Sequence, residues 1–138
     1  MELRELAERI LFSPELSVKL DCPSEITDND PGFSIEAPIV PHRNVQLQFT
    51  ENKGKSAFPA LHHLEKDSTR ARILHYFTNH ELLATELMAL VLLKFPEAPK
   101  AFRRGVLKTL KDEQEHTRMY IRRLSDIGVE FGQYRVNG

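Results

Sequence analysis

Two long stretches of the sequence have apolar residues every three or four positions, with polar residues between them. The first predicts a helix over residues 67–95, which Asp67-Ser68 can cap and Pro96 ends. The second predicts a helix over residues 99–127, with Gly128 as its C-terminal stop. Each spans about 28 residues, or roughly 42 Å, a length typical of bundle helices. Because the connection is short, we expect an antiparallel helical hairpin.

A short helical arm precedes this hairpin. Residues 2–11 carry an apolar stripe of helical spacing with charges opposite. Ser13-Pro14-Glu15 predicts a second helix start, with proline at the first helical position and an end near Leu20. Two helices this short are not stable alone, so the arm should pack on the hairpin.

The intervening residues 21–66 form a long Pro-rich loop. Prolines interrupt any helical pattern, while the alternations at 33–36 and 45–49 predict extended segments. A loop this long is unusual unless it covers a surface or serves a function. We expect it to lie across the helices, held by four apolar side chains. These are Phe33, Ile35, Phe49 and Phe58.

The predicted fold class is therefore all-α, organised in three parts that make up one incomplete domain. They are an N-terminal helical arm (1–20), an extended Pro-rich loop (21–66) and a long helical hairpin (67–138).

An acid interrupts the apolar stripe of each long helix. The first stripe comprises Ile73, Phe77, Glu81, Ala84, Met88, Val91 and Phe95. The second comprises Phe102, Val106, Leu110, Glu113, Thr117, Tyr120 and Leu124. Antiparallel pairing would place Glu81 and Glu113 at similar depth, where two carboxylates repel unless a cation lies between them.

A histidine follows the second acid at helical spacing. His116 is three residues after Glu113, so both side chains project from one side of the helix. A single Glu-x-x-His pair is weak, since polar residues at a helix midpoint usually face solvent. The matching acid at Glu81 favours a divalent metal bound by Glu81, Glu113 and His116.

A carboxylate on one helix and Glu-x-x-His on its partner form half of a ferritin-like di-metal site. Residues 75–89 (HYFTNHELLATELMA), 102–105 (FRRG), 112–116 (DEQEH) and 128–132 (GVEFG) resemble an uncharacterised bacterial ferritin-like family, Domain of Unknown Function four-five-five. The resemblance extends from Met1 to about Asn137. It implies that Glu81 bridges two metals, while Glu113 and His116 complete one of them.

Members of that family continue with two further helices, which supply a second Glu and a second Glu-x-x-His. This sequence stops at residue 138, so we expect a truncated member or an N-terminal fragment. Its partner would be the missing C-terminal half or a second copy in a homodimer. The first long helix is apolar nearly all round, which predicts an uncovered apolar stripe. The residues responsible are Leu82, Leu83, Leu87, Leu90 and Leu93.

Other polar residues of the long helices are weaker candidates. Glu86 should meet solvent or the arm, with a supporting role near the metal as an alternative. His75 and His80 are more typical of packed or hydrogen-bonded histidines than of ligands. His62-His63 in the loop should be exposed, and Tyr120 fits a core tyrosine better than a hydrogen-bond donor to the site.

Composition narrows the function classes. The formal net charge is -1, so the composition shows no excess of positive charge of the kind that binds nucleic acid or an anionic membrane. Cys22 is the single cysteine, which excludes an internal disulfide and is typical of a reducing compartment. The longest apolar run, 87–93, is too short to cross a membrane. We therefore expect a soluble cytoplasmic protein.

Three functions remain open at this point. The first is an O2-dependent oxidoreductase of hydroxylase or oxidase type that uses iron or manganese, metals suited to mixed carboxylate and imidazole ligands. The second is a metal-binding or storage module without turnover. The third is a non-catalytic helical interaction module, or an inactive fragment. The substrate is not indicated by any motif.

Overall fold

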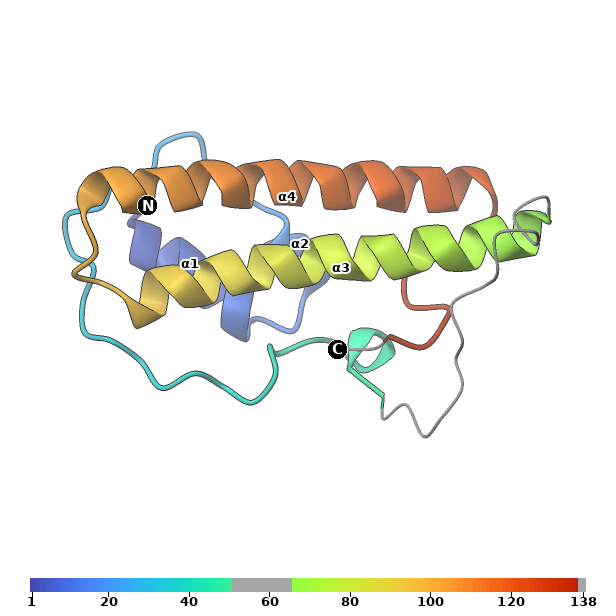
Figure 1. Cartoon of the computed structure of the whole chain (residues 1–138), viewed down its shortest axis with the longest axis horizontal. Coiled ribbons are helices and arrows are strands. Elements are labelled where there is room, and N and C mark those ends of the chain that lie inside the picture. Colours follow the sequence, from blue (N-terminus) through green and yellow to red (C-terminus); the bar gives the residue numbers. More distant parts are fainter. Residues whose placement is uncertain (51–65, 137–138) are drawn as a thin grey trace.

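The computed structural model describes residues 1–50 and 66–136 (Figure 1). Its helices confirm the all-α prediction, and within these residues the only β contacts are two isolated bridges. The elements are α1 (Leu3–Phe12), α2 (Leu16–Lys19), the 3-10 helix η1 (Val45–Leu47), α3 (Asp67–Lys94) and α4 (Lys100–Asp126). Helices α3 and α4 run antiparallel along the long axis, and α1 packs against α3. Among the described residues, no helix is both long and apolar enough to cross a membrane.

The connection between α3 and α4 is fixed by a buried arginine. Arg103 is 1% exposed and donates to the carbonyl oxygens of Leu92 and Phe95 at 2.9 and 3.1 Å. These carbonyls belong to the C-terminal end of α3, where helix geometry leaves them without helical partners. The same guanidinium pairs with the Asp28 carboxylate at 2.7 Å, which ties the loop to the turn.

Helix α4 ends as its sequence predicts. Gly128 has φ +77°, and its N–H donates to the carbonyl of Ser125 at 3.0 Å. The Val129 N–H donates to the carbonyl of Leu124 at 2.8 Å, and both of these side chains are buried in one cluster. This is a Schellman motif, in which glycine supplies the left-handed conformation that ends the helix.

Two helix starts and one loop segment differ from what the sequence predicted. Helix α2 begins at Leu16 rather than at Pro14, because the Ser13 hydroxyl accepts the Glu15 N–H and holds an extended entry. Helix α3 begins at Asp67, so the predicted capping pair already lies within the helix. Residues 45–47 are a 3-10 turn rather than extended, because the Asn44 side chain accepts the N–H of Leu47.

The loop crosses the helices, but not all the predicted contacts hold it there. Ile35 and Phe49 pack against apolar clusters, as expected. The prediction that the Phe33 side chain packs on the helices was wrong, because it is 90% exposed. The loop is held at this residue by a hydrogen bond from Arg4 to the Phe33 backbone carbonyl. Phe58 and His62-His63 lie outside the described residues.

Helix α3 buries a different side from the one its predicted stripe suggested. The buried positions are Ala71, His75, Thr78, Asn79, Leu82, Thr85, Glu86, Ala89, Leu92 and Leu93. This spacing is helical too, but half of these residues are polar, so the pattern of apolar residues did not mark this side as buried. The N-terminal arm and the loop cover it. On α4 the predicted stripe is mostly correct, since Val106, Leu110, Thr117 and Leu124 are buried.

The predicted stripe of α3 and the adjoining side of α4 form an open face. Phe77 and Phe95 are 44% and 56% exposed, and Phe102 is 51% exposed, so their assignment to the core was wrong for this chain. Ile127, the C-cap of α4, is 49% exposed on the same side as Phe102. We use "open face" for these four residues and the surface between them.

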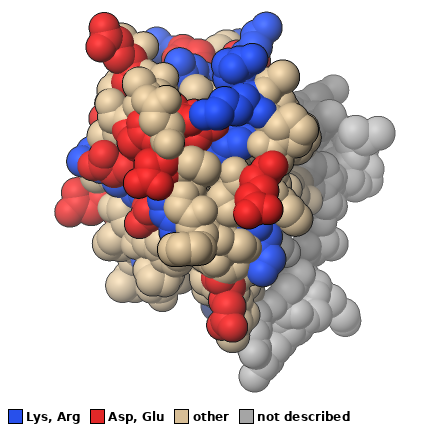
Figure 2. All heavy atoms as spheres, turned by 90° about the vertical axis from the view of Figure 1, so that its left-hand side faces the viewer, with Lys and Arg blue, Asp and Glu red and all other residues tan. Residues whose placement is uncertain are grey.

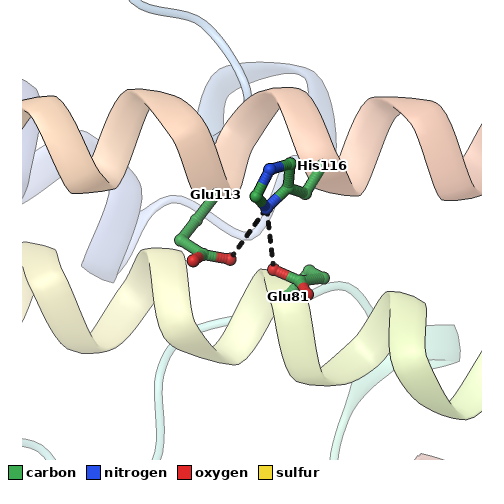
Figure 3. Close-up of side chains that lie close together, drawn as sticks. All are labelled: Glu81, Glu113 and His116. Carbon is green, nitrogen blue, oxygen red and sulfur yellow. Dashed lines mark ion pairs between the residues drawn. The ribbon is translucent and has the colours of Figure 1, made fainter.

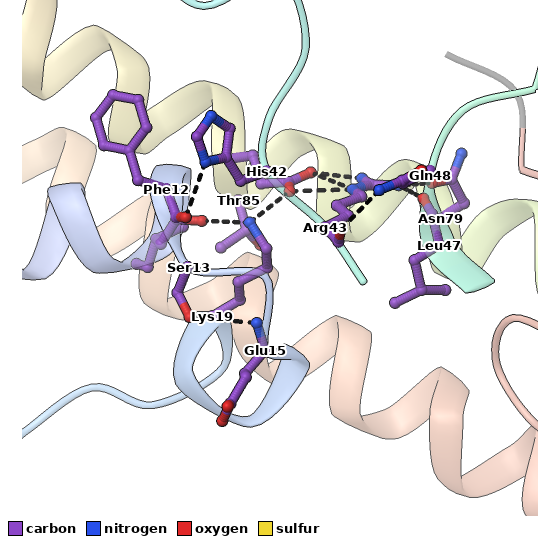
Figure 4. Close-up of polar contacts among 12 residues, drawn as sticks. Phe12, Ser13, Glu15, Lys19, His42, Arg43, Leu47, Gln48, Asn79 and Thr85 are labelled. Carbon is purple, nitrogen blue, oxygen red and sulfur yellow. Dashed lines mark hydrogen bonds and ion pairs between the residues drawn. The ribbon is translucent and has the colours of Figure 1, made fainter. Parts of the chain in front are cut away.

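A buried carboxylate joins the arm and the loop to α3 (Figure 4). Glu86 is 1% exposed; it accepts from Lys19 of α2 at 2.9 Å and from the Arg43 guanidinium. Lys19 contacts one of its carboxylate oxygens, and Arg43 contacts both. Burial lowers the pKa of Lys19, an effect that the Glu86 charge opposes. Two cations thus share one anion inside the protein.

Neutral acceptors stabilise the excess positive charge of this network. Lys19 also donates to the carbonyl of Ile10 at 2.6 Å. Arg43 donates to the carbonyl of Leu47 at 3.1 Å and to the Asn79 side chain at 2.7 Å. Its guanidinium lies 4.6 Å from the centroid of the Phe49 ring, a cation–π distance. We call Lys19, Arg43 and Glu86 the buried charge network.

The C-terminal segment is held on α3 by a neutral histidine. The His75 Nε2 accepts the Gly132 N–H at 2.9 Å, and the ring packs against Phe131 and Tyr134. An accepting Nε2 carries no proton, so the imidazole is neutral. Burial lowers the pKa of His75 from 6.5 to about 4, which favours the same state.

Replacement of Glu86 by Gln should strongly destabilise the protein, because Lys19 and Arg43 would remain buried without an anion. We expect the free energy of unfolding to fall by about 3–5 kcal/mol, as for other broken buried pairs. Urea denaturation measures this change. The control Glu97→Gln removes the same charge at an exposed position and should change stability by less than about 0.5 kcal/mol. Equal effects of the two substitutions would contradict the role of the network.

Stability should fall on acidification because of His75. Its pKa is about 4 when folded and 6.5 as the reference, so unfolding takes up a proton between these values. This contribution is fully present above pH 6.5 and is lost as the pH falls toward 4, with a slope of up to about 1.4 kcal/mol per pH unit. The measurement is the free energy of unfolding against pH for wild type, His75→Asn and the exposed-histidine control His80→Asn. Only His75→Asn should flatten the curve; a parallel curve for it would refute the assignment.

Candidate metal centre

Glu81, Glu113 and His116 come together midway along the hairpin (Figure 3). Glu81 projects from α3, and the other two residues project from α4. The Nδ1 atom of His116 lies 3.6 Å from a carboxylate oxygen of Glu81 and 3.6 Å from one of Glu113. One potential ligand atom from each residue lies within 4.8 Å of the other two. The antiparallel hairpin thus places the acids at matching depth.

The spacing of these atoms is close to that of a metal site. Metal–ligand bonds to carboxylate oxygen and imidazole nitrogen are about 2.0–2.2 Å. The three ligand atoms lie up to 4.8 Å apart, against roughly 3–4 Å for two ligands of one ion at such bond lengths, so the side chains would have to move together to bind a metal. Mixed oxygen and nitrogen ligation suits iron and manganese, so the donor set fits the predicted metals, and metal binding stays a prediction.

The centre lies on the open face rather than in the core. The side chains of Glu81 and Glu113 are 25% and 22% exposed, and that of His116 is 51% exposed. Such exposure leaves room for further ligands from another helix or from water. A metal-binding histidine usually donates its second ring N–H to an acceptor, but none is found for His116 among the described residues, where its side chain is 51% exposed.

Sequence reasoning missed a feature that both acid-bearing helices share. A threonine follows each acid by four residues, and its hydroxyl donates to the backbone carbonyl of that acid. Thr85 donates to Glu81 at 3.0 Å, and Thr117 donates to Glu113 at 2.7 Å. Both threonines are 0% exposed. The Glu-x-x-x-Thr spacing occurs in both long helices and could have been found in the sequence. Because the threonines are small and buried, the acids are the side chains that extend from that side of each helix.

The residues that were weaker candidates for metal ligands lie outside the Glu81, Glu113 and His116 cluster. His75 is buried and hydrogen-bonded, as expected, and His80 is exposed with its ring 4.2 Å from that of Tyr76. Glu86 meets the arm, which was one of its two predicted surroundings, and also the loop. Tyr120 is half-buried, so it is not a fully enclosed core residue.

Charged side chains of both signs lie at the end of the molecule where α3 passes into α4. Lys and Arg side chains gather in the upper part of this end, and Asp and Glu side chains lie beside and below them (Figure 2). The sequence as a whole has a formal net charge of -1.

The structure thus shows a helical hairpin whose two helices together present a carboxylate and imidazole cluster. A family model described as "Protein of unknown function (DUF455)" matches residues 8–138. The match covers most of the chain, which therefore belongs to this family. No curated protein and no solved structure matches the chain.

Proposed function

We propose that this chain is a ferritin-like metal-binding protein that carries half of a carboxylate-bridged di-iron or di-manganese site. The observation that supports this is the convergence of Glu81, Glu113 and His116 from two antiparallel helices. In ferritin-like bundles, two helices each supply a Glu and two supply Glu-x-x-His. Helix α3 matches the first kind, and α4 matches the second.

The ligands have distinct roles in this proposal. Glu81 of α3 would bridge the two ions, while Glu113 and His116 of α4 would hold one of them. His116 binds through Nδ1, the nitrogen that faces both carboxylates. When bound, a pair of iron or manganese ions supplies redox chemistry with O2, so we assign the completed centre to an O2-dependent oxidoreductase. A metal-binding module without turnover is the alternative, which the open, solvent-reached position of the centre favours.

The completed centre requires a second set of ligands. Each half-site has two carboxylates and one imidazole, too few for two ions. The open face extends from the half-site along both helices and carries exposed apolar side chains, including Phe77, one helical turn from Glu81, and Phe102, about three turns from Glu113. Exposed apolar surface beside polar groups is typical of an interface. We therefore propose that a second helical hairpin covers this face, supplied by a second copy of the chain or by a C-terminal half.

Metal binding can be tested by anaerobic titration with Fe(II) and with Mn(II). Wild type should bind, and Glu113→Gln should bind at least about 10- to 100-fold more weakly, the loss typical of disturbed metal sites. Asp126→Asn is the matched control, since it removes one negative charge at an exposed position of α4. Exposure to O2 then separates an oxidoreductase, which turns over with a substrate, from a binding or storage module, which oxidises Fe(II) without one. Equal affinity of Glu113→Gln and wild type would refute the site.

Metal and self-association should be linked if a second copy completes the centre. A two-fold interface would place the same three ligands of both copies opposite each other, giving a charge that balances two divalent ions. Metal at about 100 times its Kd should stabilise the dimer by about 2.7 kcal/mol per site. Sedimentation equilibrium, with and without Mn(II), measures the dimer Kd for wild type and Glu113→Gln. Only wild type should respond; four identical values would exclude the second copy and leave the C-terminal half.

A further inference from the structure

A second candidate site lies on the other side of α4. Helix α2 and α4 enclose an open groove with a volume of about 480 Å³, within the range of small-molecule sites. Arg122 lines it and follows Glu113 by about two and a half helical turns, so the groove faces away from the metal centre. The proposed metal site therefore does not account for it.

The groove has an apolar floor. It is lined by Leu16 of α2, by Leu20 directly after α2 and by Ile121 of α4, and apolar atoms make up most of its surface. Leu20 is buried, whereas Leu16 and Ile121 remain half-buried, so neither wall closes over the floor. A hydrocarbon group placed there would remove more of this apolar surface from water.

Polar contacts keep the two walls in place. The Gln114 amide donates to the carbonyls of Lys19 and Asp21 at 3.0 and 3.1 Å. Arg118 donates to the carbonyl of Leu20. Gln114 is 1% exposed, so these bonds are shielded from water. The groove is consequently formed before any ligand arrives, which reduces the entropic penalty of binding.

The rim of the groove carries uncompensated positive charge. A single carboxylate, that of Glu115, lies 3.6 Å from Arg118 and 3.3 Å from Arg122. Two guanidiniums therefore share one acid. Their side chains are 43% and 69% exposed, which leaves donors free to meet an anion from solvent.

These features match one ligand class. We propose that the groove binds a soluble medium-chain carboxylic acid, with its hydrocarbon chain on the apolar floor and its carboxylate at Arg118 and Arg122. An anionic membrane is a poorer match, because surfaces that bind one carry clusters of about four to eight basic residues. A helical peptide needs a longer groove with several anchors in register.

Methyl NMR with sodium decanoate below its micelle concentration tests the proposal. The methyl signals of Leu16, Leu20 and Ile121 should shift in a saturable manner, while 1-decanol and sodium acetate should bind at least about tenfold more weakly. Absence of shifts, or equal shifts with 1-decanol, would overturn it. Sedimentation with phosphatidylglycerol vesicles should leave the protein in solution; co-sedimentation would show a membrane headgroup as the ligand and also overturn it.

A pair of variants isolates the rim charge. Arg122→Gln should weaken decanoate binding by about three- to tenfold, the range expected for a partly exposed charge contact. Arg123→Gln removes the same charge from an adjacent exposed position that does not line the groove. It should bind decanoate as wild type does. Equal binding by both variants would show that the rim does not hold the carboxylate.

Discussion

The buried charge network is the constraint on which the rest of the described fold depends. Glu86 of α3 holds both Lys19 of the arm and Arg43 of the loop. A carboxylate inside a protein is costly unless paired, so the arm and the loop must stay docked to keep it paired. Their docking covers one side of α3. The metal ligands are left on the other side, which is why the candidate centre is open.

The hairpin could be predicted because its signals are local. Pro96 and Gly128 end the two long helices where the sequence indicated, and the short connection requires antiparallel packing. The candidate centre could be located for the same reason. Glu81 and Glu113 are at matching distances from one turn, and His116 is at helical spacing from Glu113. Whether the cluster binds iron or manganese stays a prediction.

What could not be predicted depends on contacts between distant residues. The pairing of Glu86 with Lys19 and Arg43 leaves no periodic pattern, and neither does that of Arg103 with Asp28. The sequence also could not indicate which side of α3 the arm would cover, because half of the residues on the covered side are polar. The assignment of Phe77 and similar residues to the core failed for this reason: a pattern shows that a face is apolar, not what lies against it.

The order in which the chain is made has a consequence for the N-terminal arm. Its buried apolar residues, such as Leu6 and Ile10, pack against α3, whose residues follow much later in the sequence. During synthesis the arm therefore leaves the ribosome before its docking surface exists. Exposed apolar segments of this kind are prone to association with other chains. The outer side of α1 stays polar during that interval, because it carries all four charged residues of the helix, Arg4, Glu5, Glu8 and Arg9.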